Sequence, residues 1–142
     1  LGVILVQLPP SLALDGSAEA FIQTLRARWS APVACEPRHA SWFTPEANDA
    51  LRRLEIARVA ADPPAGAPAA AEPGGWPGFV YRRLHGAPRV YYSPYTPEFL
   101  SKVAATLSRE AAAGIESWCV LDNTAEGAAP GDALALLSRL SG

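Results

Sequence analysis

The chain has 142 residues, 49% of them hydrophobic, and a net charge of −2 at pH 7, which is the size of one ordinary domain with a core of its own. This slightly acidic balance disfavours nucleic-acid binding, which needs a basic surface, and no apolar run approaches the roughly 18 residues of a membrane helix. Two cysteines, Cys35 and Cys119, lie inside apolar runs, as is typical of buried, reduced thiols in a cytoplasmic protein. We therefore expect a cytoplasmic protein with no nucleic-acid or membrane partner.

The start of the chain is itself informative. The sequence contains no Met, and residues 1–6 already form the apolar run LGVILV. Because natural chains seldom begin inside a core strand, we expect this chain to be the C-terminal part of a longer protein.

Apolar segments of strand length alternate with segments of helical period along the chain. Strands are predicted at residues 3–8, 32–36, 56–61, 79–84 and 116–121. Helices are predicted at residues 17–29, from Thr44-Pro45-Glu46 onward, at 96–113 and at 132–140, with Ser17, Thr44 and Thr96 as N-caps. The segment 62–77, which is rich in Pro and Gly, is predicted to be a surface loop in place of a crossover helix.

This alternation predicts an α/β fold, because strands joined by crossover helices must be parallel. Five βα units suit either an open doubly wound sheet or part of a barrel. A Gly-rich dinucleotide signature follows none of the strands, and composition does not choose between the two architectures.

Polar residues follow every predicted strand at its carboxyl end, where the loops of parallel α/β folds bring functional groups together. They are Gln7 after the first strand, Glu36, Arg38 and His39 after the second, Asp62 after the third, Arg83 and His85 after the fourth, and Asp122, Asn123 and Thr124 after the fifth. Turn formation alone is an alternative for Asp62, and loop hydrogen bonding for residues 122–124.

The fourth predicted strand is unusual for a buried one, because one of its faces runs from aromatic to cationic. Phe79, Tyr81, Arg83 and His85 share that face, whereas Arg82 lies on the other. Buried Arg and His side chains need partners, and Glu36, Asp62 and Asp122 are the available acids. A functional site and a purely structural ion network both fit this pattern, and we favour a site.

The same nitrogen and oxygen donors would also suit zinc or manganese. No short ligand spacing such as His-Glu-x-x-His is present, and Arg38 and Arg83 would repel a metal ion. No cofactor is therefore evident, and a divalent metal stays an alternative.

Six segments in this order make the sequence resemble the YecE-like family, domain of unknown function 72. They are VQLPPS (6–11), E-x-R-H-x-S-W (36–42), A-D-P (61–63), Y-x-R-L-H-G (81–86), Y-S-x-Y (92–95) and D-N-T-x-x-G-A (122–128). The resemblance implies a (βα)8-type barrel of uncharacterised activity, of which residues 1–142 would be a single incomplete domain, about five-eighths of the roughly 250 residues that a barrel needs. Pro37 departs from the family, which has an aromatic residue there, and this bears on how Glu36 points.

Our first hypothesis is an enzyme acting on a small anionic or polyhydroxylated molecule at the mouth of the barrel. The expected catalytic residues are Glu36, as general acid or base, with His39, His85 and Asp122. The expected substrate-binding residues are Gln7, Arg38, Asp62, Tyr81, Arg83, Asn123 and Thr124. A metal-dependent phosphoester hydrolase and a non-catalytic binding or structural module are the alternatives.

Overall fold

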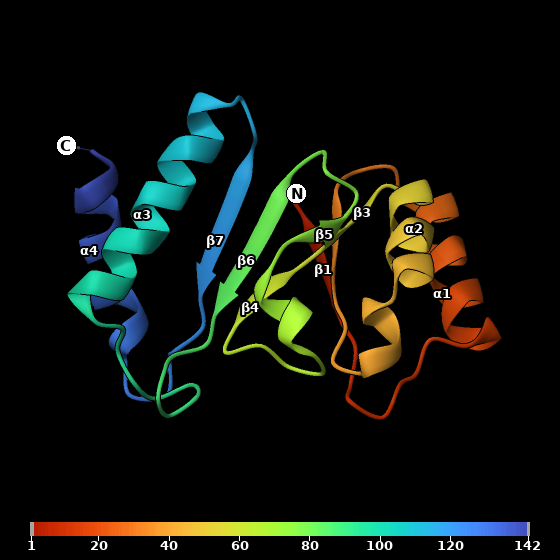
Figure 1. Cartoon of the computed structure of the whole chain (residues 1–142), viewed down its shortest axis with the longest axis horizontal. Helices are drawn as coiled ribbons and strands as arrows, with labels where there is room; N and C mark the ends of the chain where they lie inside the picture. Colours follow the sequence, from red (N-terminus) through yellow and green to blue (C-terminus); the bar gives the residue numbers. More distant parts are fainter. Residues whose placement is uncertain (1, 142) are drawn as a thin grey trace.

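The computed structural model describes residues 2–141 and is built from alternating strands and helices (Figure 1). The strands are β1 (Ile4–Gln7), β2 (Val33–Glu36), β3 (Ile56–Arg58), β4 (Ala60–Asp62), β5 (Gly74–Gly75), β6 (Val80–Leu84) and β7 (Ser117–Leu121). The helices are α1 (Gly16–Arg28), α2 (Pro45–Arg53), α3 (Pro97–Ala112) and α4 (Ala128–Leu140), with the short 3-10 helices η1 (Ala40–Phe43) and η2 (Pro68–Ala71).

The strands pair in parallel and in chain order, as predicted. β1 pairs with β2 and β2 with β3, while β4 pairs with β6 and β6 with β7. The predicted strand at 56–61 is divided into β3 and β4 at Val59, whose N–H donates to the carbonyl of Cys35 at 2.9 Å. The strands therefore form two sheets, a four-stranded one with the order β1-β2-β3-β5 and a three-stranded one with the order β4-β6-β7.

The Pro- and Gly-rich segment is mostly loop but contains two short elements that its composition did not indicate. η2 begins at Pro68, where the missing N–H of proline costs nothing. β5 pairs antiparallel with β3 and is the one antiparallel partner among the described strands. The fold is thus α/β with parallel pairing dominant.

The predicted helix starts are correct for two helices and wrong for two. Thr44 and Thr96 cap α2 and α3 through their side chains. α1 is capped by Asp15 instead of Ser17, because the Asp15 carboxylate accepts from two consecutive backbone N–H groups at 2.9 Å. α4 begins four residues earlier than predicted, because Pro130 falls in the first turn of the helix, where proline is tolerated.

The four helices cover one face of a curled sheet, α1 and α2 beside β1–β3 and α3 and α4 beside β6 and β7 (Figure 1). The other face carries its own apolar cluster, which includes Ala34, Ala57 and Tyr81. Leu5 of β1 and Val120 of β7 both pack against that cluster although they lie on edge strands of different sheets. The two sheets therefore curve together around this inner face, but within residues 2–141 β1 and β7 are not paired and no closed barrel forms.

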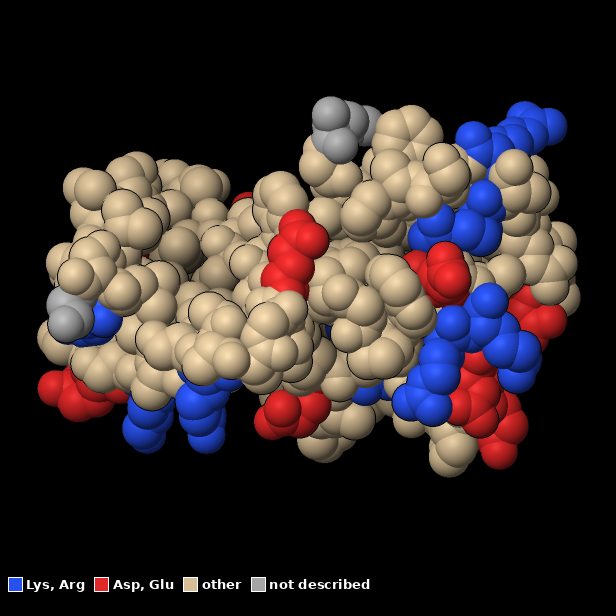
Figure 2. Space-filling model, turned by 90° about the horizontal axis from the view of Figure 1, so that it is seen from above, with Lys and Arg blue, Asp and Glu red and all other residues tan. Residues whose placement is uncertain are grey.

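The surface carries charges of both signs. At the end of the molecule where the strands begin, arginine side chains gather on the side of α1 and α2, close to acidic side chains (Figure 2). None of the helices in residues 2–141 combines the length and apolar character that crossing a membrane requires.

The two cysteines are free thiols, Cys35 buried on β2 and Cys119 half-buried on β7. Two strand positions separate them, as predicted, which is beyond disulfide reach. Burial raises the pKa of Cys35 to about 12 and that of Cys119 to about 11. Both thiols are therefore protonated at neutral pH and are poor nucleophiles.

Candidate functional site

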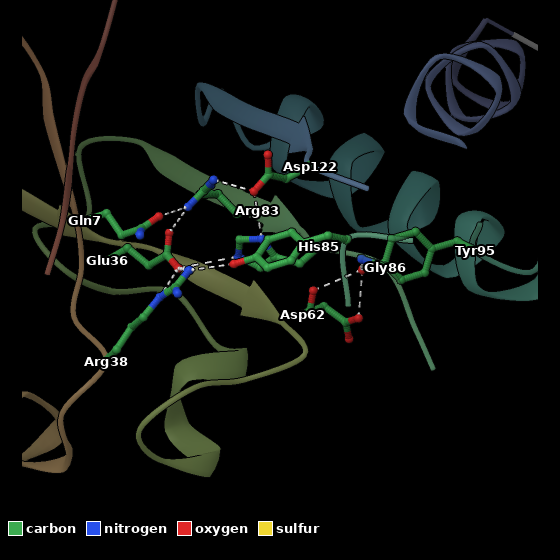
Figure 3. Close-up of polar contacts among 10 residues, drawn as sticks. Gln7, Glu36, Arg38, Asp62, Arg83, His85, Gly86, Tyr95 and Asp122 are labelled. Carbon is green, nitrogen blue, oxygen red and sulfur yellow. Dashed lines mark hydrogen bonds and ion pairs between the residues drawn. The ribbon is translucent and has the colours of Figure 1, made fainter. Parts of the chain in front are cut away.

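Polar side chains meet at the carboxyl ends of the strands, on the inner face of the sheet (Figure 3). They are Gln7 at the end of β1, Glu36 at the end of β2, Arg83 on β6, and His85 and Asp122 directly after β6 and β7. Gln7 and Glu36 are register partners and so share a face. Arg83 pairs in register with Val120 of the inner cluster, which places the Arg83 side chain on that same face.

Arg83 joins three of these strands through its guanidinium. Nη1 donates to Gln7 Oε1 at 2.6 Å and to Glu36 Oε2, and Nη2 donates to Asp122 Oδ2 at 2.6 Å. Arg83 is only 9% exposed, so its charge would be costly without partners. The two carboxylates offset this desolvation through charge-assisted hydrogen bonds, as the sequence pattern predicted for Glu36.

Glu36 is held from two sides. Arg38 Nε and Nη2 donate to Glu36 Oε1 at 3.1 and 2.9 Å, while Arg83 takes the other oxygen. Burial raises the pKa of Glu36, but the neighbouring His85 ring and the hydrogen-bonded guanidinium groups of Arg83 and Arg38 outweigh it and lower the pKa from 4.5 to about 2. Glu36 is therefore a fixed anion at neutral pH, which suits an acceptor or a positioning group better than a general acid.

His85 lies between the two carboxylates and is 3% exposed. Its Nδ1 is 3.0 Å from Asp122 Oδ2, so Nδ1–H is the donor when the ring is neutral. Its Nε2 is 3.4 Å from Glu36 Oε1 and makes no hydrogen bond in the described part of the chain. One nitrogen is thus fixed by Asp122, and the other makes no hydrogen bond but lies within ion-pair distance of Glu36.

A pocket of about 220 Å³ is lined in part by His85. Its lining residues are Glu36, Arg38, Pro63, Pro64, Ala65, His85, Val90 and Tyr91. The Tyr91 ring packs edge-on against the His85 ring, with 5.5 Å between the ring centroids. The volume is below the roughly 300–1,000 Å³ of pockets for drug-sized ligands, so the pocket suits a small molecule.

A larger groove of about 510 Å³ lies between α3, β7 and α4. It is lined mainly by Leu and Ala, and its one titratable side chain is Cys119, whose pKa burial raises to about 11. The groove therefore lacks the polar chemistry found at the strand ends.

Asp62 stands at a strand end, as predicted, but does not join the cluster. Asp62 is in register with Leu84, so its side chain lies on the face opposite to Arg83. Its carboxylate Oδ1 accepts from the hydroxyl of Tyr95 at 3.0 Å. The expectation that Asp62 is an alternative partner for Arg83 is therefore wrong, because strand register assigns the two side chains to different faces.

His39, Tyr81 and Thr124 also lie apart from the hydrogen-bonded cluster. His39 caps η1, and its Nδ1 accepts from the N–H of Ser41 at 3.2 Å and lies 2.9 Å from the Ser41 hydroxyl. Tyr81 shares the face of Arg83, as predicted, but packs in the apolar layer beneath it. Thr124 is exposed in the loop after β7.

Asn123 is fully buried, and its side-chain amide forms hydrogen bonds with other parts of the chain. Its Nδ2 donates to the carbonyl of Ser93 at 3.0 Å and to Asp132 Oδ2 at 2.7 Å. Asp132 Oδ2 also accepts the backbone N–H of Tyr95 at 3.0 Å. These contacts tie the loop after β6 to the loop after β7 and to α4.

Tyr95 extends this network to β4, and sequence reasoning missed both Tyr95 and Asp132. The Tyr95 hydroxyl accepts from the backbone N–H of Gly86 at 2.8 Å and lies 3.0 Å from the carbonyl of Asp62 (Figure 3). Gly86 has φ of 92°, and a Cβ there would lie 2.6 Å from the Ser93 carbonyl, so only glycine fits. The motif Y-S-x-Y was the available signal for Tyr95, whereas no local pattern marks Asp132.

In residues 2–141 no three His, Cys, Asp or Glu side chains form a group that could hold a metal ion. The carboxylates of the cluster are instead bonded to the guanidinium groups of Arg38 and Arg83. The donor set is therefore that of an ion-pair network.

The chain belongs to the family described as "Protein of unknown function DUF72", whose model matches residues 1–142. This confirms the resemblance that the six sequence motifs carry. None of the curated proteins matches the chain.

Two solved structures of the family share the fold. A DUF72 family protein of Thermotoga maritima has a TM-score of 0.79 at 24% identity, and the match covers 99% of this chain and 58% of that protein. A DUF72 family protein of Enterococcus faecalis has a TM-score of 0.79 at 19% identity, covering 96% of this chain and 57% of that protein. The chain thus spans less than two thirds of these relatives.

Proposed function

We propose that the cluster is the active site of an enzyme that acts on a small polar molecule, anionic or polyhydroxylated, at the mouth of a (βα)8-type barrel. The parallel strands in chain order, the helices on the outer face and the curvature around an inner cluster support a barrel of which this chain supplies five strand positions and four α-helices. Polar groups at the carboxyl ends of the strands occupy the place where barrel enzymes have their active sites.

The observation that carries the proposal is the environment of His85. His85 is a buried imidazole in the wall of a pocket, with Nδ1 held by Asp122 and Nε2 without a hydrogen bond, and this arrangement suits a group that takes or gives a proton at Nε2. Asp122 fixes the tautomer and the ring orientation and stabilises the charged ring when a proton arrives.

Glu36 and Gln7 have supporting roles in this proposal. The fixed anion of Glu36 accepts a hydrogen bond from a bound hydroxyl group and stabilises positive charge on His85. Arg83 on β6 holds Glu36 in place, and Gln7 on β1 accepts a hydrogen bond from the same nitrogen of Arg83. Arg38, at the pocket wall, can donate to a ligand oxygen.

A binding or structural module is the second candidate, and one observation favours it. Arg83 bonds to Gln7, Glu36 and Asp122, so the network is already well paired without a ligand. The unpartnered Nε2 of His85 favours the enzyme, because a purely structural network would be expected to satisfy this buried atom.

The enzyme and the binding or structural module predict different effects of replacing His85. Protein samples are incubated with a panel of small sugars, polyols, hydroxy acids and sugar phosphates, and both binding and conversion are followed by proton NMR. We expect conversion of a panel member by the unaltered protein and by the control variant His39→Asn, and binding without conversion by His85→Asn. Equal conversion by His85→Asn, or no binding of any panel member, would contradict the proposal.

A further inference from the structure

The two arginines of the site, Arg38 and Arg83, already form ion pairs with the carboxylates of the same site. Arg83 uses both terminal nitrogens on Gln7, Glu36 and Asp122. Arg38 places Nε and Nη2 on the Glu36 carboxylate. A phosphate or carboxylate ligand would therefore have to compete with Glu36 for guanidinium groups that are held in place.

The charge around the site also disfavours an anion. Glu36 and Asp122 balance Arg38 and Arg83, which leaves no net charge while His85 is neutral. An added anion would therefore meet no unpaired cation in the site.

A cationic ligand is disfavoured for a complementary reason. The Glu36 carboxylate at the pocket is already bonded to two guanidinium groups, and Arg38 itself lines the wall. An ammonium group would meet a cation and no free carboxylate in the pocket as described.

Uncharged hydroxyl groups match the hydrogen-bonding atoms of the site that the ion pairs do not use. Glu36 retains acceptor capacity, His85 Nε2 lacks a partner, and Arg38 Nη1 has no intramolecular hydrogen bond in the described structure. A hydroxyl both donates and accepts, so it can serve each of these atoms without bringing a charge into a balanced site. Pro63, Pro64 and Val90 supply apolar wall for the C–H face of a ring, and about 220 Å³ limits the ligand to roughly one small ring.

Resting on the active site proposed above, we propose that its substrate is an uncharged polyhydroxylated molecule the size of a monosaccharide, and not an anion or an amine. The charge-neutral ion-pair network is the specificity element. It holds Arg38 and Arg83 against Glu36, so that the pocket presents hydrogen-bonding groups without an unpaired charge.

Matched ligands that differ in one group test this selectivity. Glucose is compared with glucuronate and glucosamine, and inositol with inositol monophosphate, by NMR titration of the protein. We expect the uncharged member of each set to bind at least about tenfold more tightly than its charged counterparts. Its affinity should also change less than about twofold when NaCl is raised from low to high concentration, because no ligand charge is screened.

The outcomes separate this inference from the proposed function. Tighter, salt-sensitive binding of glucuronate or inositol monophosphate would overturn the inference and leave the active site standing, as would tighter binding of glucosamine. Failure of every ligand, charged or uncharged, to bind near His85 would overturn both.

The variant Glu36→Gln gives a second test, because removing this carboxylate frees the charge of Arg38 and part of that of Arg83. We expect its preference to move toward glucuronate by about tenfold or more. An unchanged preference in a folded Glu36→Gln protein would contradict the role assigned to the ion pairs. If the variant does not fold, the salt titration of the unaltered protein decides.

Discussion

Arg83 and Glu36, 47 residues apart in the chain, form an ion pair in the buried end of the sheet, where both side chains point to the inner face. Neither charge is tolerable there alone, because each is almost completely removed from water. The pair therefore ties the order of the strands to the geometry of the candidate site.

This relationship predicts unequal effects of two neighbouring substitutions. Arg83→Ala leaves Glu36 and Asp122 without their shared partner and should cost about 3 kcal/mol of unfolding free energy. Arg82→Ala breaks a single ion pair, with Glu110 on the outer face, and should cost less, about 1 kcal/mol, because only one carboxylate loses its partner. Urea denaturation measures both, and equal losses, or a larger loss for Arg82→Ala, would show that the face assignment is wrong.

The low pKa of Glu36 predicts a loss of stability in acid. Because the folded pKa of about 2 lies below the ordinary value of 4.5, the ionised group stabilises the folded state above pH 4.5. That contribution is lost as the pH falls from about 4.5 toward 2. Unfolding measured against pH should show this loss in the unaltered protein and a shallower slope in Glu36→Gln, and identical slopes would refute the assignment.

The Tyr95 hydroxyl should matter more than that of a neighbouring tyrosine. Tyr95→Phe leaves the buried N–H of Gly86 without its acceptor and should cost about 1–3 kcal/mol. Tyr92→Phe is the matched control and should cost less than about 0.5 kcal/mol, because the ring that packs on Arg89 is kept. Thermal melts of the two variants test this difference. A Tyr95→Phe protein as stable as the control would show that the Tyr95 hydroxyl does not stabilise the fold.

The cysteines should react slowly with thiol reagents while the protein is folded. Burial raises the pKa values of Cys35 and Cys119 to about 12 and about 11, so little thiolate is present at neutral pH. Two thiols should react rapidly after unfolding without reductant. A folded protein that is labelled at once, or an unfolded one with no free thiol, would contradict the structure.

Much of the fold follows from local pattern, because the periods of strands and helices are written into neighbouring residues. The alternation in residues 79–85 correctly placed Arg83 on the inner face and Arg82 toward the helices. Thr44 and Thr96 before Pro-Glu correctly marked two helix starts. These signals are local, so a single sequence carries them.

The features that sequence reasoning missed depend on pairing between distant segments. The face of Asp62 is set by its register with Leu84, which no local pattern specifies. Asp132 meets the backbone of Tyr95 across 37 residues, and the carboxylate was not recognisable as part of the site region. His39 follows a strand, as the other site residues do, and its Nδ1 is bonded to Ser41, two residues further along the chain.

The nitrogen NMR signals of the His85 ring test the central claim most directly, at a pH where the ring is neutral. We predict a proton on Nδ1, held by Asp122, and an unprotonated Nε2 whose signal shifts when a bound polyol such as glucose is added. Asp122→Asn should disturb this tautomer, because it removes the charged acceptor at Nδ1. A proton on Nε2 in the unaltered protein, or His85 signals that stay constant while the ligand binds, would contradict a role for His85 in moving a proton at this site.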